Sequence, residues 1–275
     1  MVKNILIIGL TQENAGKTSL AQAFLSYFSD QKKKTSGFKP FSGYNYWYHF
    51  DMAHHALSQG RLYGKDITKL EEQSTIKTTI ELVNPIHRLW NEPAILDPLT
   101  SIPPFIMDRF TICKHDVAQH HLLLNQHLID HIPKTYQQKL NENDYELHTV
   151  DSIQSMNAVI QTFYNNGIET CYDHIRKQCD TIIIESYADN ALLPWKNLSG
   201  FDAVFGIKPR EIHKFDPDKY VKAVELSKPV SAWETSTKKL SDLLKPIDIF
   251  HQEPTLSTNI LNQLKQQMPQ MLEDV

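Results

Sequence analysis

The sequence is poor in cysteine and has no long apolar run. Its 275 residues include three cysteines, Cys113, Cys171 and Cys179. An odd number at this spacing matches neither a disulfide framework nor a metal-ligand pattern, which favours a reducing compartment. No stretch approaches the roughly 20 apolar residues that a membrane helix needs, and the first apolar run, Ile5 to Ile8, is too short for a signal peptide. We therefore expect a soluble, cytoplasmic protein without a membrane partner.

The sequence also lacks a large excess of charge of either sign. Its formal net charge is −4, with acidic and basic residues mixed along the chain, so no general attraction to nucleic acid or anionic membranes is expected. Histidine is frequent, at 13 residues, but His54–His55 and His120–His121 are adjacent pairs whose side chains diverge on a helix or a strand. The composition therefore predicts neither a nucleic-acid partner nor a histidine metal site.

Residues 4–18 carry the strongest pattern in the sequence. Ile5 to Ile8 predict a short buried strand that ends at Gly9, and apolar residues recur at helical spacing after Lys17. A segment ending in Ala-Gly-Lys-Thr between a strand and a helix is typical of a phosphate-binding loop, although Thr11 stands where the usual first glycine would be. The alternative, a glycine turn with an exposed lysine, does not explain why four of the nine glycines lie within the first 43 residues.

A loop of this kind predicts a site for ATP and Mg²⁺. Backbone amides and the helix N-terminus hold phosphate oxygens, the lysine neutralises phosphate charge, and the hydroxyl after it binds the metal. Lys17 is therefore the first candidate catalytic cation and Thr18 the first candidate metal ligand. The pattern leaves the choice between ATP and GTP open. The candidate nucleotide-binding residues are Thr11, Gln12, Glu13, Asn14, Ala15, Gly16, Lys17, Thr18 and Ser19.

Three further segments offer candidate residues. A predicted strand that ends at Lys39-Pro40 puts the ammonium of Lys39 and the hydroxyl of Ser42 at the edge where open α/β sheets bind ligands; the alternative for Lys39 is a surface lysine before a turn. Asp51 is a candidate Mg²⁺ ligand or a helix cap. Tyr44 to Phe50, which is densely aromatic, predicts either core or the wall of a substrate pocket.

A second buried strand is predicted at Thr181 to Ser186, with Glu185 at its carboxyl end. An acid in this position binds the metal in phosphate-loop proteins. We interpret Glu185 as a third metal ligand, and the alternative is an ordinary capped strand end.

The remaining pattern predicts further elements. These are a β-hairpin over 106–112 and 121–129, helices over 153–163 and 168–178 separated by a break at Asn165 to Gly167, a strand at 203–207, a helix at 216–225, a strand at 229–233 and a terminal helix at 256–272. Residues 133–149 support no clear prediction. We expect an α/β fold in a single domain, residues 1–275.

These motifs together resemble dethiobiotin synthetase and the related ATPases that include the cobyrinic acid amidases and MinD-like proteins. The resemblance covers residues 2–98 and 181–195. The family loop, Thr-Asp-Thr-Glu-Val-Gly-Lys-Thr, aligns without a gap with Thr11 to Thr18. The family's Lys-Pro-x-x-Ser-Gly resembles the segment from Lys39 to Gly43, which is one residue shorter, and its Val-Asn-Pro and Glu-Pro steps resemble Val83 to Pro85 and Glu92-Pro93.

The resemblance implies a doubly wound, mainly parallel sheet of the P-loop NTPase type, with an inserted hairpin and helix region at about 99–150, and a homodimer. It also implies an ATP-dependent ligase, in which a carbamate is phosphorylated and a second amine displaces the phosphate. Lys17, Lys39 and Ser42 would be catalytic, and Thr18, Asp51 and Glu185 would hold Mg²⁺. A nucleotide-dependent switch without a small-molecule substrate is the alternative function.

The sequence departs from the family pattern around the substrate. Glu13 replaces a small threonine, and the glycine-rich turn after Glu185 has become Ser186-Tyr187-Ala188-Asp189. A carboxylate near the substrate or the phosphate opposes an anionic ligand and favours an amine-rich one. We therefore expect a different small substrate, and a pocket that Glu13 faces and that part of Tyr44 to Tyr48 lines.

Overall fold

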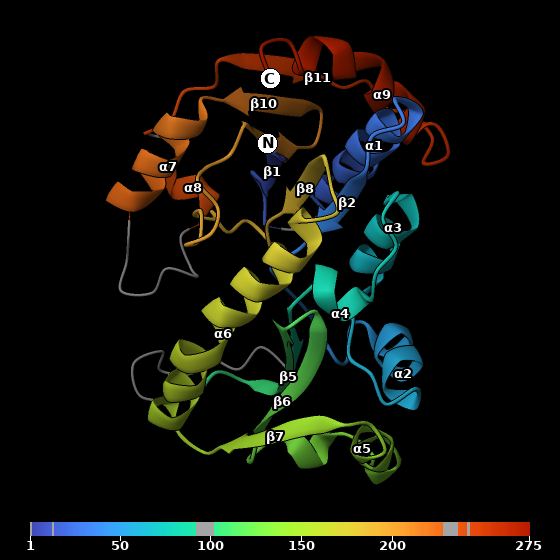
Figure 1. Cartoon of the computed structure of the whole chain (residues 1–275), viewed down its shortest axis with the longest axis vertical. Helices are drawn as coiled ribbons and strands as arrows, with labels where there is room; N and C mark the ends of the chain where they lie inside the picture. The colour runs from blue at the N-terminus through green and yellow to red at the C-terminus, as the bar shows by residue number, and fades with distance from the viewer. Residues whose placement is uncertain (1, 13, 92–101, 228–235, 241–242) are drawn as a thin grey trace. The chain divides into compact units, whose positions relative to one another are not determined.

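The computed structural model describes residues 2–12, 14–91, 102–227, 236–240 and 243–275 (Figure 1). The chain divides into two compact units. Unit 1 comprises Met1–Lys39, Lys69–Lys77 and Ile175–Val275, and unit 2 comprises Pro40–Thr68 and Thr78–His174. Within the described residues the strands form two mixed sheets, one in each unit. The predicted α/β class is confirmed.

The sheet of unit 1 is built around the first strand of the chain. Its order is β11 (Asp248–His251), β10 (Glu211–Phe215), β9 (Ala203–Lys208), β1 (Lys3–Gly9), β8 (Thr181–Glu185) and β2 (Thr35–Phe38). The strands from β9 to β2 are parallel, whereas β10 and β11 pair antiparallel. The β-branched apolar runs in β1 and β8 are buried throughout, as expected for parallel strands covered on both faces. The strands predicted from residues 5, 181 and 203 are confirmed.

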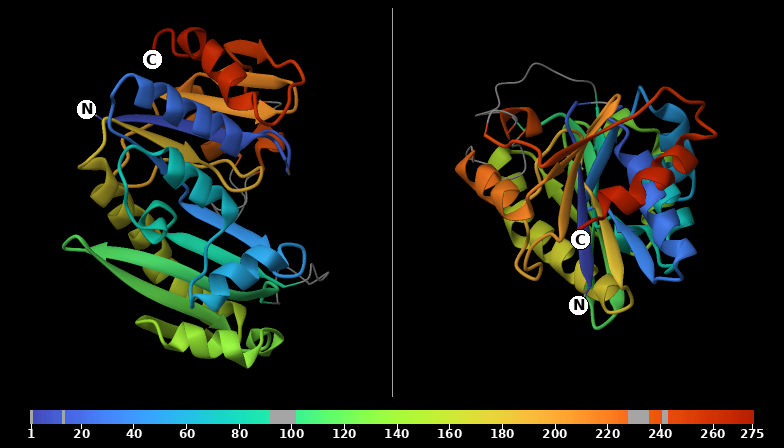
Figure 2. Two further views of the ribbon diagram at one scale, coloured as in Figure 1. Left: turned by 90° about the vertical axis from the view of Figure 1, so that its right-hand side faces the viewer. Right: turned by 90° about the horizontal axis from the view of Figure 1, so that it is seen from above.

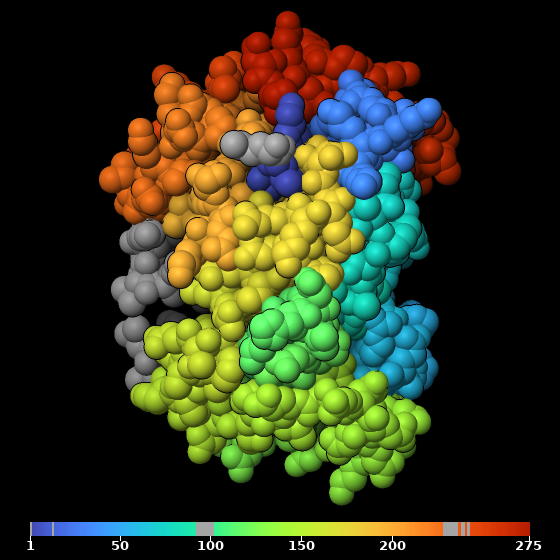
Figure 3. All heavy atoms as spheres, in the orientation of Figure 1, coloured from blue at the N-terminus to red at the C-terminus, as the bar shows by residue number. Residues whose placement is uncertain are grey.

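Helices lie on both faces of this sheet (Figure 2). On one face α1 (Lys17–Asp30) packs beside α9 (Ile260–Met271), where Lys265 Nζ lies 2.5 Å from Asp30 Oδ2. On the other face lies α7 (Pro217–Leu226), whose residues reach the surface (Figure 3). Asp216 caps α7 by accepting a hydrogen bond from the amide of Lys219 at 2.9 Å, so this predicted helix start is confirmed. The strand predicted at 229–233 lies outside the described residues.

Unit 2 contains the predicted hairpin. Its sheet has the order β3 (Phe41–Asn45), β4 (Ile86–Trp90), β5 (Phe105–Lys114), β6 (Val117–Asn125) and β7 (Tyr145–Val150), and β5 and β6 pair antiparallel. His115 and Asp116 both have positive φ, 50° and 63°, as a two-residue turn of type I′ requires. The short helices of this unit are α2 (Phe50–Ser58), α4 (Ile80–Val83), η1 (Ile129–His131) and α5 (Lys134–Asn141).

Two helices contain residues of both units. They are α3 (Lys65–Gln73) and α6 (Ile153–Arg176). The predicted break at Asn165 to Gly167 is wrong, because α6 is continuous through it. The Gly167 Cα approaches β5 so closely that a Cβ there would lie 2.7 Å from the carbonyl oxygen of Thr111. Gly167 is therefore a contact residue within a helix and does not end it.

The predicted mainly parallel sheet is found in unit 1, but the prediction did not include a second sheet. Residues 41–45 and 86–90 form strands that join the hairpin in a second sheet. The predicted insertion at 99–150 falls within unit 2, and the single nucleotide-binding domain remains a prediction. No helix in the described part of the chain is long and apolar enough to cross a membrane.

Candidate functional site

Three parallel strands of unit 1 bring the candidate residues to one edge of the sheet. The register pairs Ile7 of β1 with Glu185 of β8, and Phe38 of β2 with Ile184. Lys39 directly follows β2 and so lies level with Glu185. Since the carboxyl ends of parallel strands share an edge, the strand order β1-β8-β2 alone aligns the loop after β1, Glu185 and Lys39.

The loop between β1 and α1 uses glycine at both of its ends. A Cβ at Gly9 would lie 2.7 Å from the carbonyl oxygen of Ala188 and 2.9 Å from Lys17 Nζ. Gly16 directly precedes α1 with a φ of 97°, a left-handed conformation that glycine adopts without strain. The first turn of α1, from Lys17, has no acidic side chain and no side-chain cap. Helix N-termini of this kind favour anions.

Glu185 is the centre of a charged cluster. Its carboxylate oxygen Oε1 lies 2.7 Å from Lys39 Nζ and accepts a hydrogen bond from the hydroxyl of Thr18 at 3.1 Å. Lys39 and Glu185 are both buried, at 5% and 1% side-chain exposure. Lys17 Nζ donates to the carbonyl oxygen of Ala188 at 2.6 Å. The sequence-predicted residues Lys17, Thr18, Lys39 and Glu185 are thus brought together within unit 1.

Two buried oxygens of this cluster have no hydrogen-bond partner within the described residues. They are Glu185 Oε2 and the hydroxyl of Ser186. A buried carboxylate oxygen that forms no hydrogen bond is costly in a folded protein unless a ligand satisfies it. The carboxylate and the Thr18 hydroxyl are the hard oxygen donors that Mg²⁺ prefers. These residues therefore fit a magnesium ion.

A segment that the sequence analysis did not connect with the loop also reaches it. The hydroxyl of Thr237 donates to the carbonyl oxygen of Gly9, and the Thr237 amide donates to Asp189 O at 2.7 Å. Ser236 Oγ donates to Asp189 Oδ2 at 2.5 Å. The turn after β8, which departs from the family pattern, is therefore held by residues near the start of α8 (Thr237–Leu240). No local pattern could have found this contact.

Ser42 and Asp51 belong to unit 2 and are not part of the cluster in unit 1. The Ser42 hydroxyl is buried and hydrogen-bonds Asn84 Oδ1 at 2.8 Å and His87 Nδ1 at 2.6 Å. Asp51 is exposed in the first turn of α2, where His49 is the N-cap residue. A carboxylate in this turn interacts favourably with the helix dipole. The catalytic role of Ser42 and the metal role of Asp51 remain predictions.

The aromatic segment Tyr44 to Phe50 belongs to the core only in part. Tyr44 and Tyr46 belong to the core of unit 2, whereas Trp47 and Tyr48 are exposed. Burial raises the pKa of the Tyr44 phenol. Glu13 lies outside the described residues, so the proposed pocket between it and these side chains remains a prediction.

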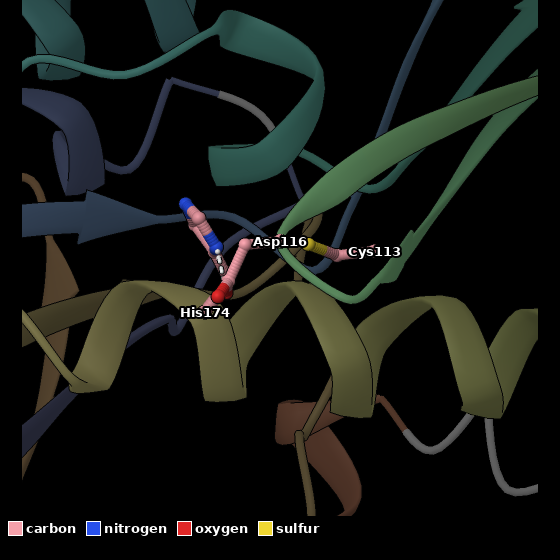
Figure 4. A group of neighbouring side chains, drawn as sticks. All are labelled: Cys113, Asp116 and His174. Carbon is pink, nitrogen blue, oxygen red and sulfur yellow. Dashed lines mark hydrogen bonds and ion pairs between the residues drawn. The ribbon is translucent and has the colours of Figure 1, made fainter.

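Unit 2 contains a group of potential metal ligands that sequence spacing did not indicate. Cys113 at the end of β5, Asp116 in the hairpin turn and His174 in α6 lie together (Figure 4). Asp116 Oδ1 is 2.9 Å from His174 Nδ1. The three potential ligands come from separate elements, so no short sequence motif could have predicted the group.

No protein-family model and no curated protein matches this sequence.

Proposed function

We propose that this protein is an ATP- and Mg²⁺-dependent P-loop enzyme, similar to dethiobiotin synthetase, that activates a small metabolite by phosphorylation and ligation. The observation that carries the proposal is that side chains from two segments meet at the carboxylate of Glu185. Thr18 from the loop and Lys39 from β2 both contact Oε1, while Oε2 is buried and has no hydrogen bond in the described residues. This arrangement suits a metal ligand next to a phosphate-binding helix.

The residues of unit 1 support a division of roles. Loop amides, the N-terminus of α1 and Lys17 would bind the phosphates, and Lys39 would neutralise charge on the group that is transferred. Thr18 and Glu185 would hold Mg²⁺, which supplies further charge neutralisation on the phosphates. Phosphoryl transfer needs mostly positioning and charge neutralisation, so two lysines and one carboxylate are suited to it.

The arrangement of unit 1 supports a P-loop fold of the doubly wound type. The loop follows a central parallel strand, the acid follows the neighbouring strand β8, and helices lie on both faces of the sheet (Figure 2). The bulkier turn from Ser186 to Asp189 favours a substrate different from the diamino acid of dethiobiotin synthetase. Its additional carboxylate, Asp189, favours an amine-rich substrate.

The first experiment measures nucleotide binding. Lys17→Ala removes a charge-assisted contact to phosphate, worth about 1.5–3 kcal/mol, so we expect ATP affinity to fall by about 10- to 150-fold. Lys196→Ala, at an exposed position of unit 1, is the matched control and should bind like the wild type. Unchanged ATP affinity of the Lys17 variant by calorimetry contradicts the nucleotide site.

The second experiment separates the ligase from the switch. ATP turnover is measured with Mg²⁺ alone and after addition of bicarbonate and a panel of diamines. Stimulation by an amine supports the ligase, and the diamino acid of dethiobiotin synthetase should be a poor substrate. Slow hydrolysis that no amine stimulates supports the nucleotide-dependent switch. Efficient formation of dethiobiotin, lost on Lys39→Ala, would contradict the expected change of substrate.

A further inference from the structure

Two histidines and a glutamate of unit 2 lie on one face of its sheet. Strands β6 and β7 are parallel, and their register pairs His121 with Glu146 and Leu123 with His148. Side chains two residues apart in a strand point to the same face, so Glu146 and His148 share a face with His121. The adjacent residue His120 points the other way and hydrogen-bonds Thr111 Oγ1 instead.

The three side chains direct their polar atoms at a common point. His121 Nδ1 lies 3.2 Å from His148 Nε2 and 3.4 Å from Glu146 Oε2, and His148 Nε2 lies 3.9 Å from Glu146 Oε1. Ligand atoms bound at about 2.0–2.1 Å to a tetrahedral zinc ion are about 3.3–3.4 Å apart. The two distances to Glu146 end at different oxygens of its carboxylate, and all three distances are close to the edge length of a zinc coordination tetrahedron.

The surroundings hold the buried imidazole in place. His121 is 3% exposed and stacks on Phe110, with ring centroids 4.6 Å apart and planes 3° apart, and it also stacks on Phe163 of α6. Burial lowers the pKa of His121, with a smaller opposing contribution from Glu146. The second ring nitrogen, Nε2, is buried and has no hydrogen bond within the described residues.

The side opposite the aromatic rings is open. The side chain of Glu146 is 67% exposed and that of His148 is 17% exposed. Residues of β7 contribute to the surface in Figure 3. An ion could therefore enter beside Glu146, and a water molecule could take the fourth position. Two imidazoles and one carboxylate form a donor set that is common at zinc sites with an open position.

We propose that His121, Glu146 and His148 form a binding site for a divalent transition-metal ion of the Zn²⁺ type, which ties β7 to β6. The site consists of residues of unit 2 and does not depend on the proposed function. Binding to the folded chain alone stabilises it, so the ion should raise the midpoint of thermal unfolding.

The experiment titrates full-length, metal-free protein with Zn²⁺ in the absence of nucleotide. Glu146→Gln is the principal variant, because the side chain is exposed and the amide has the same shape without the charge. His148→Gln is the second. We expect each to weaken Zn²⁺ binding by at least about tenfold, the scale of losing even an outer partner of a metal site, and to abolish the zinc-dependent rise in Tm.

Two further variants serve as controls. His55→Ala removes an exposed histidine of unit 2 and should leave Zn²⁺ binding unchanged. Cys113→Ser tests the neighbouring Cys113, Asp116 and His174 group, and it should also leave the affinity unchanged. Bound Co²⁺ should give the visible absorption of a tetrahedral site without a thiolate band.

Three outcomes overturn the proposal. In the first, the wild-type protein takes up no Zn²⁺ at micromolar concentration, so the three side chains are only a hydrogen-bonded group. In the second, Glu146→Gln and His148→Gln bind with wild-type affinity. In the third, Cys113→Ser abolishes binding and these two variants do not, which assigns the ion to the other group.

Discussion

Each unit contains a buried ion pair, and the two pairs are satisfied to different degrees. In unit 2 the guanidinium of Arg88 donates to both oxygens of Asp108, at 2.7 and 2.6 Å, and Tyr164 donates to the same carboxylate. In unit 1 Glu185 uses Oε1 for Lys39 and Thr18, and its Oε2 is buried without a hydrogen bond in the described residues.

Aromatic rings complete the environment of the pair in unit 2. The Arg88 guanidinium lies 4.9 Å from the ring centre of Trp90 and 4.8 Å from that of Phe105. Burial acts to lower the pKa of Arg88, but the neighbouring Asp108 and its hydrogen bonds raise it above the usual value, so the guanidinium stays charged. A buried pair whose hydrogen-bonding atoms are all satisfied serves the fold. A pair that leaves one carboxylate oxygen open is suited to bind a cation.

Replacing Asp108 should have the largest effect on stability. In Asp108→Asn the side-chain NH₂ group would face an N–H of the Arg88 guanidinium in either orientation of the amide, and both groups are donors. Breaking a buried pair in this way costs about 3–5 kcal/mol in the free energy of unfolding, measured by urea denaturation. Asp144→Asn, at an exposed position of unit 2, is the control and should change stability little. A loss below about 1 kcal/mol contradicts the structural role.

Replacing Glu185 should cost less stability and more activity. In Glu185→Gln the NH₂ group can take the position of Oε2, which has no hydrogen bond to lose, while the amide oxygen still accepts from Lys39 and Thr18. We expect a loss of about 1.5–3 kcal/mol, from the weaker contact to Lys39, and a fall in Mg²⁺-dependent turnover far larger than any fall in metal-free nucleotide binding.

Glu225→Gln, exposed on α7, is the control for this variant. Wild-type turnover of Glu185→Gln across a Mg²⁺ titration refutes the metal role. A loss of stability equal to that of Asp108→Asn would remove the difference between the two pairs.

The two units can also be compared at one glycine in each, where a neighbouring atom leaves no room for a Cβ. Gly9 makes room beside Lys17 Nζ in unit 1, whereas Gly167 makes room for a backbone carbonyl of β5 in unit 2. In Gly167→Ala the helix propensity improves by about 1 kcal/mol, but the Cβ contact with Thr111 O at 2.7 Å forces a shift. We expect a net loss of about 1–2 kcal/mol in urea denaturation. Asn165→Ala, exposed on α6, should be neutral or stabilising; an equal gain in both variants contradicts the packing role.

The smallest effect on stability is expected for Asp51→Asn. The side chain is exposed in the first turn of α2, so its charge contributes only about 0.3–1 kcal/mol through the helix dipole. If Asp51 is the metal ligand that the family resemblance implies, Mg²⁺-dependent turnover should nevertheless fall sharply. Wild-type turnover across a Mg²⁺ titration would confine the metal site to unit 1.

Much of the candidate site could be predicted because it depends on neighbouring residues. The apolar runs before Gly9 and Glu185 predicted the two strands, and parallel pairing then brings their carboxyl ends together. The hairpin turn at His115 and Asp116 is equally local. The contact between Thr237 and Gly9 joins residues far apart in the sequence. The hydrophobic periodicity of a segment cannot predict such a contact, because the periodicity would be the same if the contact did not form.

By itself, the sequence determined which segments become buried strands and amphipathic helices, and which of them end in a Gly-Lys-Thr loop, a lysine or a carboxylate, because these properties follow from local spacing and side-chain chemistry. Only the tertiary structure decided which strands pair. Pairing separated the strands into two sheets and placed His121 beside His148. The packing of distant segments kept α6 continuous at Gly167 and, among the described residues, left Oε2 of Glu185 without a hydrogen bond. Those outcomes depend on the packing and hydrogen bonding of distant residues, which the order of residues along the chain does not display.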